Sequence, residues 1–238
     1  MNDHIFHPLR YRDRWFAYLD LLGFKNLVKS KAIGDVMEIY YEALNQMNRA
    51  CQYGKSTGGL LSSWFSDTFI IYSQSDSLED FARVESAVRI FFQLLLIRNI
   101  PVRGCISHGK LYSQAKKNIF IGPALIEAHM YGEALNWVGF CLAPSVEKKL
   151  EICLPIEQRA HYRKVTDQKI IRNEKISRNE QVAHLYAFAF NNGTVNGENP
   201  NQKALQKLRD EAPPSAKEKY DNSLEFLDLW CPKFSGGK

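Results

Sequence analysis

Apolar and polar residues follow two periods along this chain, one typical of β-strands and one typical of α-helices. The run "WFAYLDLL" at 15–22 is almost entirely apolar and predicts a buried strand, whereas the apolar residues of 78–98 recur every three or four positions and predict a helix with one buried face. Residues 110–120 are expected to form a loop or an irregular hairpin. Up to residue 151, we expect strands at 15–22, 60–65, 68–73, 102–109 and 137–143, and helices at 23–30, 33–51, 78–98, 122–132 and 144–151.

This order of elements predicts an α+β fold of the ferredoxin-like kind, an antiparallel-rich sheet with helices packed on one face. The chain changes character after about residue 155, where it becomes polar and highly charged. A last strand is expected at 184–190, and two helices within 201–230. We therefore expect a principal domain at 1–155 and a C-terminal extension at 156–238 that packs on it or on a second subunit.

Composition narrows the class of protein. The chain has 238 residues, 45% of them hydrophobic, and a formal net charge of +5. These values allow a full hydrophobic core and suit an anionic ligand such as a nucleoside triphosphate. Lysine and arginine form no run long enough to act as a basic arm, so we expect no nucleic-acid partner.

The cysteines and the apolar segments indicate where the protein works. Five cysteines are scattered along the chain without a CxxC pair, which argues against a disulfide framework or a zinc site and favours a reducing compartment. The N-terminus lacks the apolar segment of a signal peptide, and the most apolar helical stretch, "IFFQLLLI", is too short to span a bilayer. We expect a soluble cytoplasmic protein without a membrane partner.

Two carboxylates stand at the ends of apolar strands. Asp20 ends the first predicted strand, and Asp67 lies in the two-residue turn of the predicted hairpin. If both strands are neighbours in one sheet, the two side chains meet, and they repel strongly unless a cation lies between them. Carboxylate oxygens suit hard Mg²⁺ or Mn²⁺. Two simpler readings stay open, because Asp20 is also suited to capping the following helix and Asp67 to forming a turn.

The motifs around these aspartates resemble those of class III nucleotide cyclases. "YLDLLGF" followed by "FSD" is similar to their metal-binding strand and hairpin, and "VRGCISHGKLY…IFIGPALIEAH" resembles their R-x-G-x-x-x-G…G-x-x-V-N region. The resemblance covers roughly residues 14–145, and within the superfamily it is greatest to the pyrimidine cyclases of bacterial Pycsar anti-phage systems. It implies a class III cyclase core, two Mg²⁺ or Mn²⁺ ions, and a head-to-tail homodimer with active sites at the interface.

The resemblance assigns roles to particular residues. It makes Asp20 and Asp67 the metal aspartates, and it gives Leu21 the backbone carbonyl that binds one ion. Ile126 and Met130 occupy the positions of the Asn and Arg that orient the ribose and stabilise the transition state in the family. Another cation is then expected to stabilise the transition state. Arg103 is our catalytic candidate, and the remaining candidates are Lys110, Lys116 and Lys117.

The base is expected to be a pyrimidine. The positions that read a purine in the family hold Leu61 or Ser63, and Ile119, none of them charged. The resemblance therefore implies conversion of UTP to 3′,5′-cyclic UMP and pyrophosphate, a second messenger in anti-phage defence. Three alternatives remain, namely a cyclase that converts CTP to cyclic CMP, a purine nucleotide cyclase, and an inactive cyclase-like module that binds a nucleotide or a protein.

Overall fold

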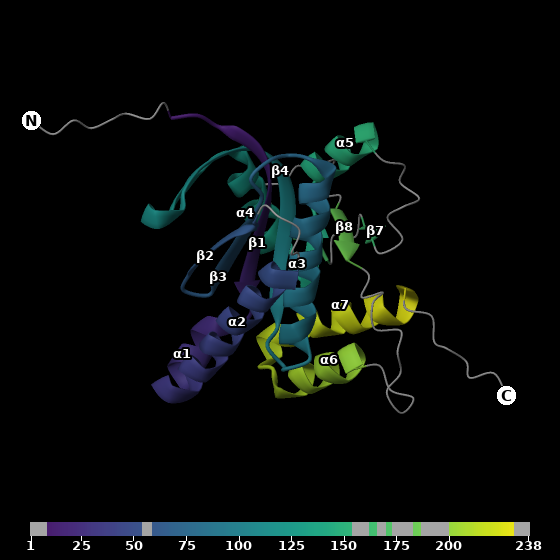
Figure 1. Ribbon diagram of the computed structural model, residues 1–238. Helices are drawn as coiled ribbons and strands as arrows, with labels where there is room; N and C mark the ends of the chain where they lie inside the picture. The colour runs from purple at the N-terminus through teal and green to yellow at the C-terminus, as the bar shows by residue number, and fades with distance from the viewer. Residues whose placement is uncertain are drawn as a thin grey trace, which may run out of the picture.

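A computed structural model of the chain describes residues 9–53, 59–153, 162–165, 170–172, 183–186 and 200–230 (Figure 1). The strands are β1 (Arg12–Leu21), β2 (Leu61–Phe65), β3 (Thr68–Tyr72), β4 (Val102–Gln114), β5 (Ile119–Ile121), β6 (Gly139–Leu142), β7 (Tyr162–Val165) and β8 (Ala183–Tyr186). The helices are α1 (Phe24–Ser30), α2 (Ile33–Tyr53), α3 (Leu78–Leu96), the 3₁₀ turn η1 (Ala115–Lys117), α4 (Pro123–Ala134), α5 (Pro144–Cys153), α6 (Pro200–Glu211) and α7 (Pro214–Trp230).

The strands form one sheet in the order β2-β3-β1-β4-β6-β8-β7, and β5 pairs with β4 outside this path. Only the β4–β6 pairing is parallel among the described strand pairs. The four strands β4-β1-β3-β2, connected through α2 and α3, have the ferredoxin-like β-α-β-β-α-β arrangement. The predicted α+β fold is therefore confirmed.

Helices lie on both faces of the sheet, so the prediction that they cover one face is wrong. Trp15, Ala17 and Leu19 of β1 belong to the large core beneath α2 and α3. The alternate residues Phe16 and Tyr18 belong to a second cluster that includes Ala124 and Ala128 of α4. A strand buried on both faces needs the nearly continuous apolar run that β1 has.

The segment expected as a loop or an irregular hairpin is a hairpin. β4 continues to Gln114 and pairs with β5 from Tyr112 to Gln114. The 3₁₀ turn η1 connects the two strands, and Asn118 ends it with a positive φ of 53°. The predicted final strand is observed as β8, while its expected continuation at 187–190 and the expected boundary at residue 155 lie outside the described residues.

The last two helices, α6 and α7, pack against α3 and against the segment that precedes β6. α6 contacts α3, and the ring of Phe226 in α7 packs on Trp137 with 5.2 Å between the ring centroids. The Val138 amide donates a 2.8 Å hydrogen bond to Ser223 Oγ, and Asn222 Nδ2 donates to the Asn136 carbonyl at 2.8 Å. Within the described ranges, no helix has both the length and the apolar composition that a bilayer-spanning helix needs.

The close pairing of β1 and β4 depends on Gly104. A Cβ at this position would lie 2.3 Å from the Tyr18 carbonyl oxygen and 3.0 Å from Leu19 Cα, both of them backbone atoms. Gly104→Ala therefore has to push the two central strands apart, and we expect it to lower the free energy of unfolding by about 1–3 kcal/mol or more. Urea denaturation measures this loss. Gly34→Ala in α2 is the control, because its Cβ would meet open space, and an equal loss in both variants would contradict the packing argument.

Candidate active site

Four segments meet at the end of β1 where Asp20 lies. In the sheet, Asp20 pairs with Thr68 of β3 on one side and with Arg103 of β4 on the other. The next residue, Leu21, donates its amide to the Asp67 carbonyl oxygen at 3.0 Å. The backbone pairing thus brings together the two aspartates that the sequence analysis singled out, and it adds Arg103 beside them.

The hairpin that carries Asp67 has a strained tip. Phe65 pairs with Thr68, so Ser66 and Asp67 alone make the turn, as the sequence predicted. Ser66 has a φ of 55°, a left-handed conformation that costs an L-residue roughly 1–2 kcal/mol and that glycine adopts freely. Such strain is common where a side chain is held for a function.

Asp20 is a largely buried carboxylate with charges of both signs around it. Its side chain is 13% exposed, and Arg103 Nη2 lies 3.4 Å from its Oδ2 atom. Burial raises the pKa of Asp20 to about 6, the Arg103 charge opposes this shift, and the Asp67 and Glu133 charges add to it. Arg103 therefore does not neutralise the site by itself.

Glu133, at the end of α4, holds Arg103 in place. Arg103 Nη2 lies 2.5 Å from Glu133 Oε2, and Nη1 donates to the Glu133 carbonyl at 2.9 Å. The Tyr18 hydroxyl donates to the other carboxylate oxygen of Glu133 at 3.2 Å. Because its strongest contacts go to Glu133, Arg103 stays fixed beside Asp20 whatever else binds there.

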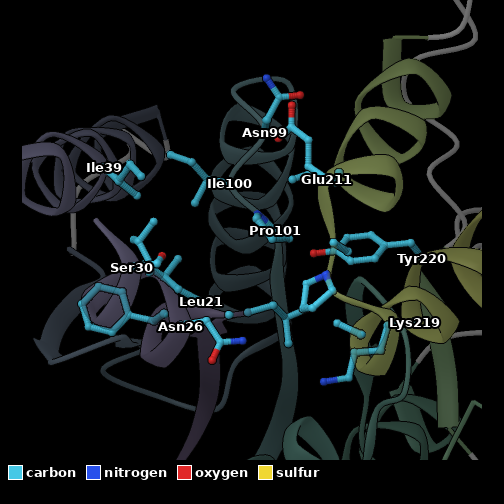
Figure 2. Close-up of a pocket in the computed structure, with 18 of the residues that line it drawn as sticks. Leu21, Asn26, Ser30, Ile39, Asn99, Ile100, Pro101, Glu211, Lys219 and Tyr220 are labelled. Carbon is cyan, nitrogen blue, oxygen red and sulfur yellow. The ribbon is translucent and has the colours of Figure 1, made fainter. Parts of the chain in front are cut away.

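A cavity of about 420 Å³ lies at the loop that follows Asp20 in the chain (Figure 2), and Asp20 itself does not line it. One wall consists of Leu21–Phe24, which follow Asp20 directly, and another consists of residues from α6 and α7. Lys219 of α7 lines the cavity and also lies within electrostatic range of Asp20, Arg103 and Glu133. The C-terminal helices therefore reach the same end of the sheet as the two aspartates.

Three of the cationic candidates lie elsewhere in the chain. Lys110 pairs with Asp13, seven positions along β4 from Arg103, which is roughly 23 Å in a strand. Lys116 and Lys117 lie beyond it in η1. Within one protomer these three lysines lie far from Asp20, because antiparallel pairing sends β4 away from it.

The residues at the expected Asn and Arg positions both lie on α4. Ile126 is 64% exposed, while Met130 is half-buried and packs against the large core. Neither side chain carries a charge. In the described part of the chain, the arginine and lysine near Asp20 are therefore supplied by β4 and α7.

The positions expected to read the base adjoin one another. Ser63 is buried in β2, and its hydroxyl donates to Asn118 Oδ1 at 3.0 Å, directly before Ile119 of β5. Leu61 packs half-buried against the second cluster. The structure thus brings these three positions together where the β2–β3 and β4–β5 hairpins meet, with no charged group among them.

Sequence reasoning did not identify Glu133 or Lys219. Glu133 follows Tyr131-Gly132 at the end of a helix, and Lys219 is one of several lysines in the tail, so no local pattern distinguishes either residue. Both reach the site through contacts between segments that are far apart in the chain. The buried environment of Asp20 was signalled, since it ends an apolar run.

The donor atoms at this site fit a hard divalent cation. Asp20 and Asp67 offer carboxylate oxygens, and the surplus negative charge at Asp20 is what a dication would offset. Among the described residues, no three His, Cys, Asp or Glu side chains form a cluster that could hold a metal by themselves.

Comparison with known proteins identifies the fold. The sequence matches no model of a protein family and no curated protein. Among solved structures, the adenylyl cyclase CyaB from P. aeruginosa is 14% identical with a TM-score of 0.52, over 74% of this chain and 93% of that one. The monomeric guanylyl cyclase domain of the RhoGC fusion protein from the aquatic fungus Blastocladiella emersonii is 8% identical with a TM-score of 0.53, over 74% and 95%.

A third similar structure is the guanylate cyclase domain of RhGC from Catenaria anguillulae in complex with GTP. It is 9% identical with a TM-score of 0.50, over 65% of this chain and 86% of that one. At these identities the likeness concerns the fold. The chain has the fold of class III nucleotide cyclase domains.

The raised pKa of Asp20 predicts how stability depends on pH. With its pKa at about 6 in the folded state and 3.8 as its ordinary value, Asp20 binds a proton on folding between these pH values. The free energy of unfolding of the metal-free protein should therefore decrease as the pH rises through this window. Asp20→Asn removes the decrease, so we expect a gain of up to about 3 kcal/mol at pH 8 that disappears at pH 4.

Urea denaturation with a chelator between pH 4 and pH 8 measures this difference. Asp13→Asn is the matched control, because Asp13 lies on the same strand and is exposed. The N-cap of α1 is Gly23, so Asp20 does not cap this helix. An Asp20→Asn variant that is less stable than the unchanged protein at pH 8 would show that the ion pair with Arg103 outweighs the cost of burying the carboxylate.

Proposed function

We propose that this protein is a metal-dependent nucleotide cyclase, a phosphorus–oxygen lyase that converts UTP to 3′,5′-cyclic UMP and pyrophosphate. The observation that carries the proposal is the meeting of Asp20 and Asp67 at the end of β1, in a fold shared with adenylyl and guanylyl cyclase domains. A lone aspartate in either position would be an ordinary cap or turn residue. A cap or turn role does not explain why backbone pairing holds two carboxylates together despite their repulsion, whereas metal binding does.

The proposed reaction is an in-line displacement at the α-phosphorus. Asp20, Asp67 and the Leu21 carbonyl would hold two Mg²⁺ or Mn²⁺ ions, whose charge acidifies the 3′-hydroxyl and offsets that of the triphosphate. The ribose 3′-oxygen forms a bond to the α-phosphorus as the bond to the bridging oxygen breaks. Pyrophosphate leaves with that electron pair, and the hydroxyl proton passes to solvent.

Arg103 is the cation that we assign to the transition state. Its guanidinium lies beside Asp20 and is oriented by Glu133 through two contacts. A donor fixed before the reaction stabilises charge that develops on the phosphoryl oxygens without having to reorganise. Glu133 in this scheme is a positioning residue that acts through Arg103.

The choice of a pyrimidine rests on the absence of a charged group at the three expected base-reading positions. Ser63, buried and bonded to Asn118, offers a small hydroxyl, while Leu61 and Ile119 offer apolar surface. CTP is the nearest alternative, because UTP and CTP share the ribose, the triphosphate and the pyrimidine ring and differ only at C4 and N3 of the base. With the resemblance to the Pycsar cyclases, the product would be a second messenger in anti-phage defence.

We also propose that the active enzyme is a homodimer. Three apolar side chains on α4, β5 and the β2–β3 hairpin are exposed in the single chain, namely Ile126 (64%), Ile121 (53%) and Phe65 (79%). A guanylyl cyclase domain of the RhoGC fusion protein with a TM-score of 0.53 and 10% identity is described as a non-canonical dimer. Head-to-tail pairing would let Lys116 and Lys117 of one protomer serve the partner's site, which they do not reach in their own chain.

An inactive binding module is the second candidate. Ile126 and Met130 provide neither an amide nor a guanidinium at the positions that supply them in the family. Such a protein would bind a nucleotide without turnover. Activity and metal dependence separate the two candidates.

The decisive assay supplies each of the four nucleoside triphosphates with Mn²⁺ and identifies the products by mass spectrometry. We expect cyclic UMP, abolished by chelation and reduced at least about 100-fold by Asp20→Ala or Asp67→Ala, the scale of losing one transition-state contact. Asp13→Ala should retain full activity. Turnover of purines alone would end the pyrimidine assignment, and unchanged activity in both site variants would end the metal mechanism.

A further inference from the structure

Lys219 is an unusual lysine of the C-terminal extension. It is half-buried on α7, and no carboxylate of the described residues lies within ion-pair distance of its ammonium group. Figure 2 shows its side chain directed from α7 toward the strands of the sheet. Partial burial of an ammonium group without an ion-pair partner costs free energy, and a bound anion would offset that cost.

The electrostatic surroundings of Lys219 are those of the candidate active site. Burial and the like charge of Arg103 lower the pKa of Lys219, while Glu133 and Asp20 raise it. Two cations on separate elements, Arg103 on β4 and Lys219 on α7, therefore lie within range of the same buried carboxylate. This pair can hold two different groups of one polyanion.

The cavity lets a polyanion extend toward Lys219. Its volume of about 420 Å³ falls within the range of roughly 300–1,000 Å³ typical of small-molecule sites. One wall starts at Leu21, directly after Asp20, and the charged residues in the lining are Lys31, Lys219 and Glu211. The cavity therefore extends from the loop after Asp20 to Lys219, whose charge interacts with that of Asp20.

We propose that Lys219 is a substrate-binding residue that contacts the β- and γ-phosphates of the nucleotide, so that α7 forms part of the active site. This inference rests on the proposed function, because it takes the triphosphate to be the substrate. It goes beyond the ferredoxin-like unit, to which α7 does not belong. An ammonium group is well suited to this task, since it binds phosphate oxygens as a point charge.

The test uses inorganic tripolyphosphate, with Mg²⁺, as a probe that has the charge of the substrate without ribose or base. Calorimetry on the full chain should show binding that Lys219→Met weakens at least tenfold and that Lys219→Arg largely restores. Lys217→Met is the matched control, because Lys217 lies two residues earlier on α7, about 200° around the helix axis, and does not line the cavity. It should bind the probe as the unchanged protein does.

Kinetics with the nucleotide provides the second measurement. Lys219→Met should raise KM at least tenfold and lower kcat much less, because the lost contact is made in the ground state as well as in the transition state. Its melting temperature without ligand should be equal to or above that of the unchanged protein, since an unpaired buried charge is removed. A merely structural lysine would lower the melting temperature and leave KM unchanged.

The outcomes separate this inference from the proposed function. Absence of tripolyphosphate binding, or equal binding by the Lys219→Met variant, overturns the inference even if the enzyme makes cyclic UMP. Binding that depends on Lys219, in a protein that cyclises no nucleotide, supports the polyphosphate site and overturns the cyclase proposal. Formation of cyclic UMP, together with weaker tripolyphosphate binding and a raised KM in Lys219→Met but not in Lys217→Met, supports both.

Discussion

The repulsion between two aspartates at one end of the sheet is the constraint on which the site depends. Asp20 and Asp67 are held near each other by backbone hydrogen bonds, through the β1–β3 pairing and the contact from the Leu21 amide to the Asp67 carbonyl. Side chains that repel do not assemble by themselves, so the sheet supplies the energy that keeps them together. Burial raises the pKa of Asp20 to about 6, the Asp67 charge adds to this shift, and a carboxylate in such surroundings favours a cation beside it.

Two other elements place positive charges near the negative charge of the aspartates. From α4, Glu133 fixes Arg103 beside Asp20 and keeps one positive charge at the strand end. From the C-terminal extension, Lys219 adds a second positive charge next to the cavity. The position of α7 is set by buried contacts of Ser223 and Phe226 to the segment before β6, which links the extension to the central sheet.

Much of the architecture was predictable because it depends on local patterns. The hairpin with its two-residue tip, the long helix α3 and the pair α6–α7 follow from short apolar runs, helical periodicity and a Pro-Pro break. The prediction failed on which faces the helices cover. Periodicity shows that an element has a buried side, but it does not show which face of the sheet receives a helix such as α4.

The sequence alone determined most of the strands, the fold class and the two aspartates, since each is encoded in neighbouring residues, but β5 and β7 were not among the predicted strands. The tertiary structure alone decided which cations accompany those aspartates. It removed Lys110 from the site, because an antiparallel strand carries that residue away from Asp20, and it added Glu133 and Lys219. The physical reason is that a side chain's electrostatic environment is made by segments distant in sequence, whose meeting depends on how the strands and helices pack.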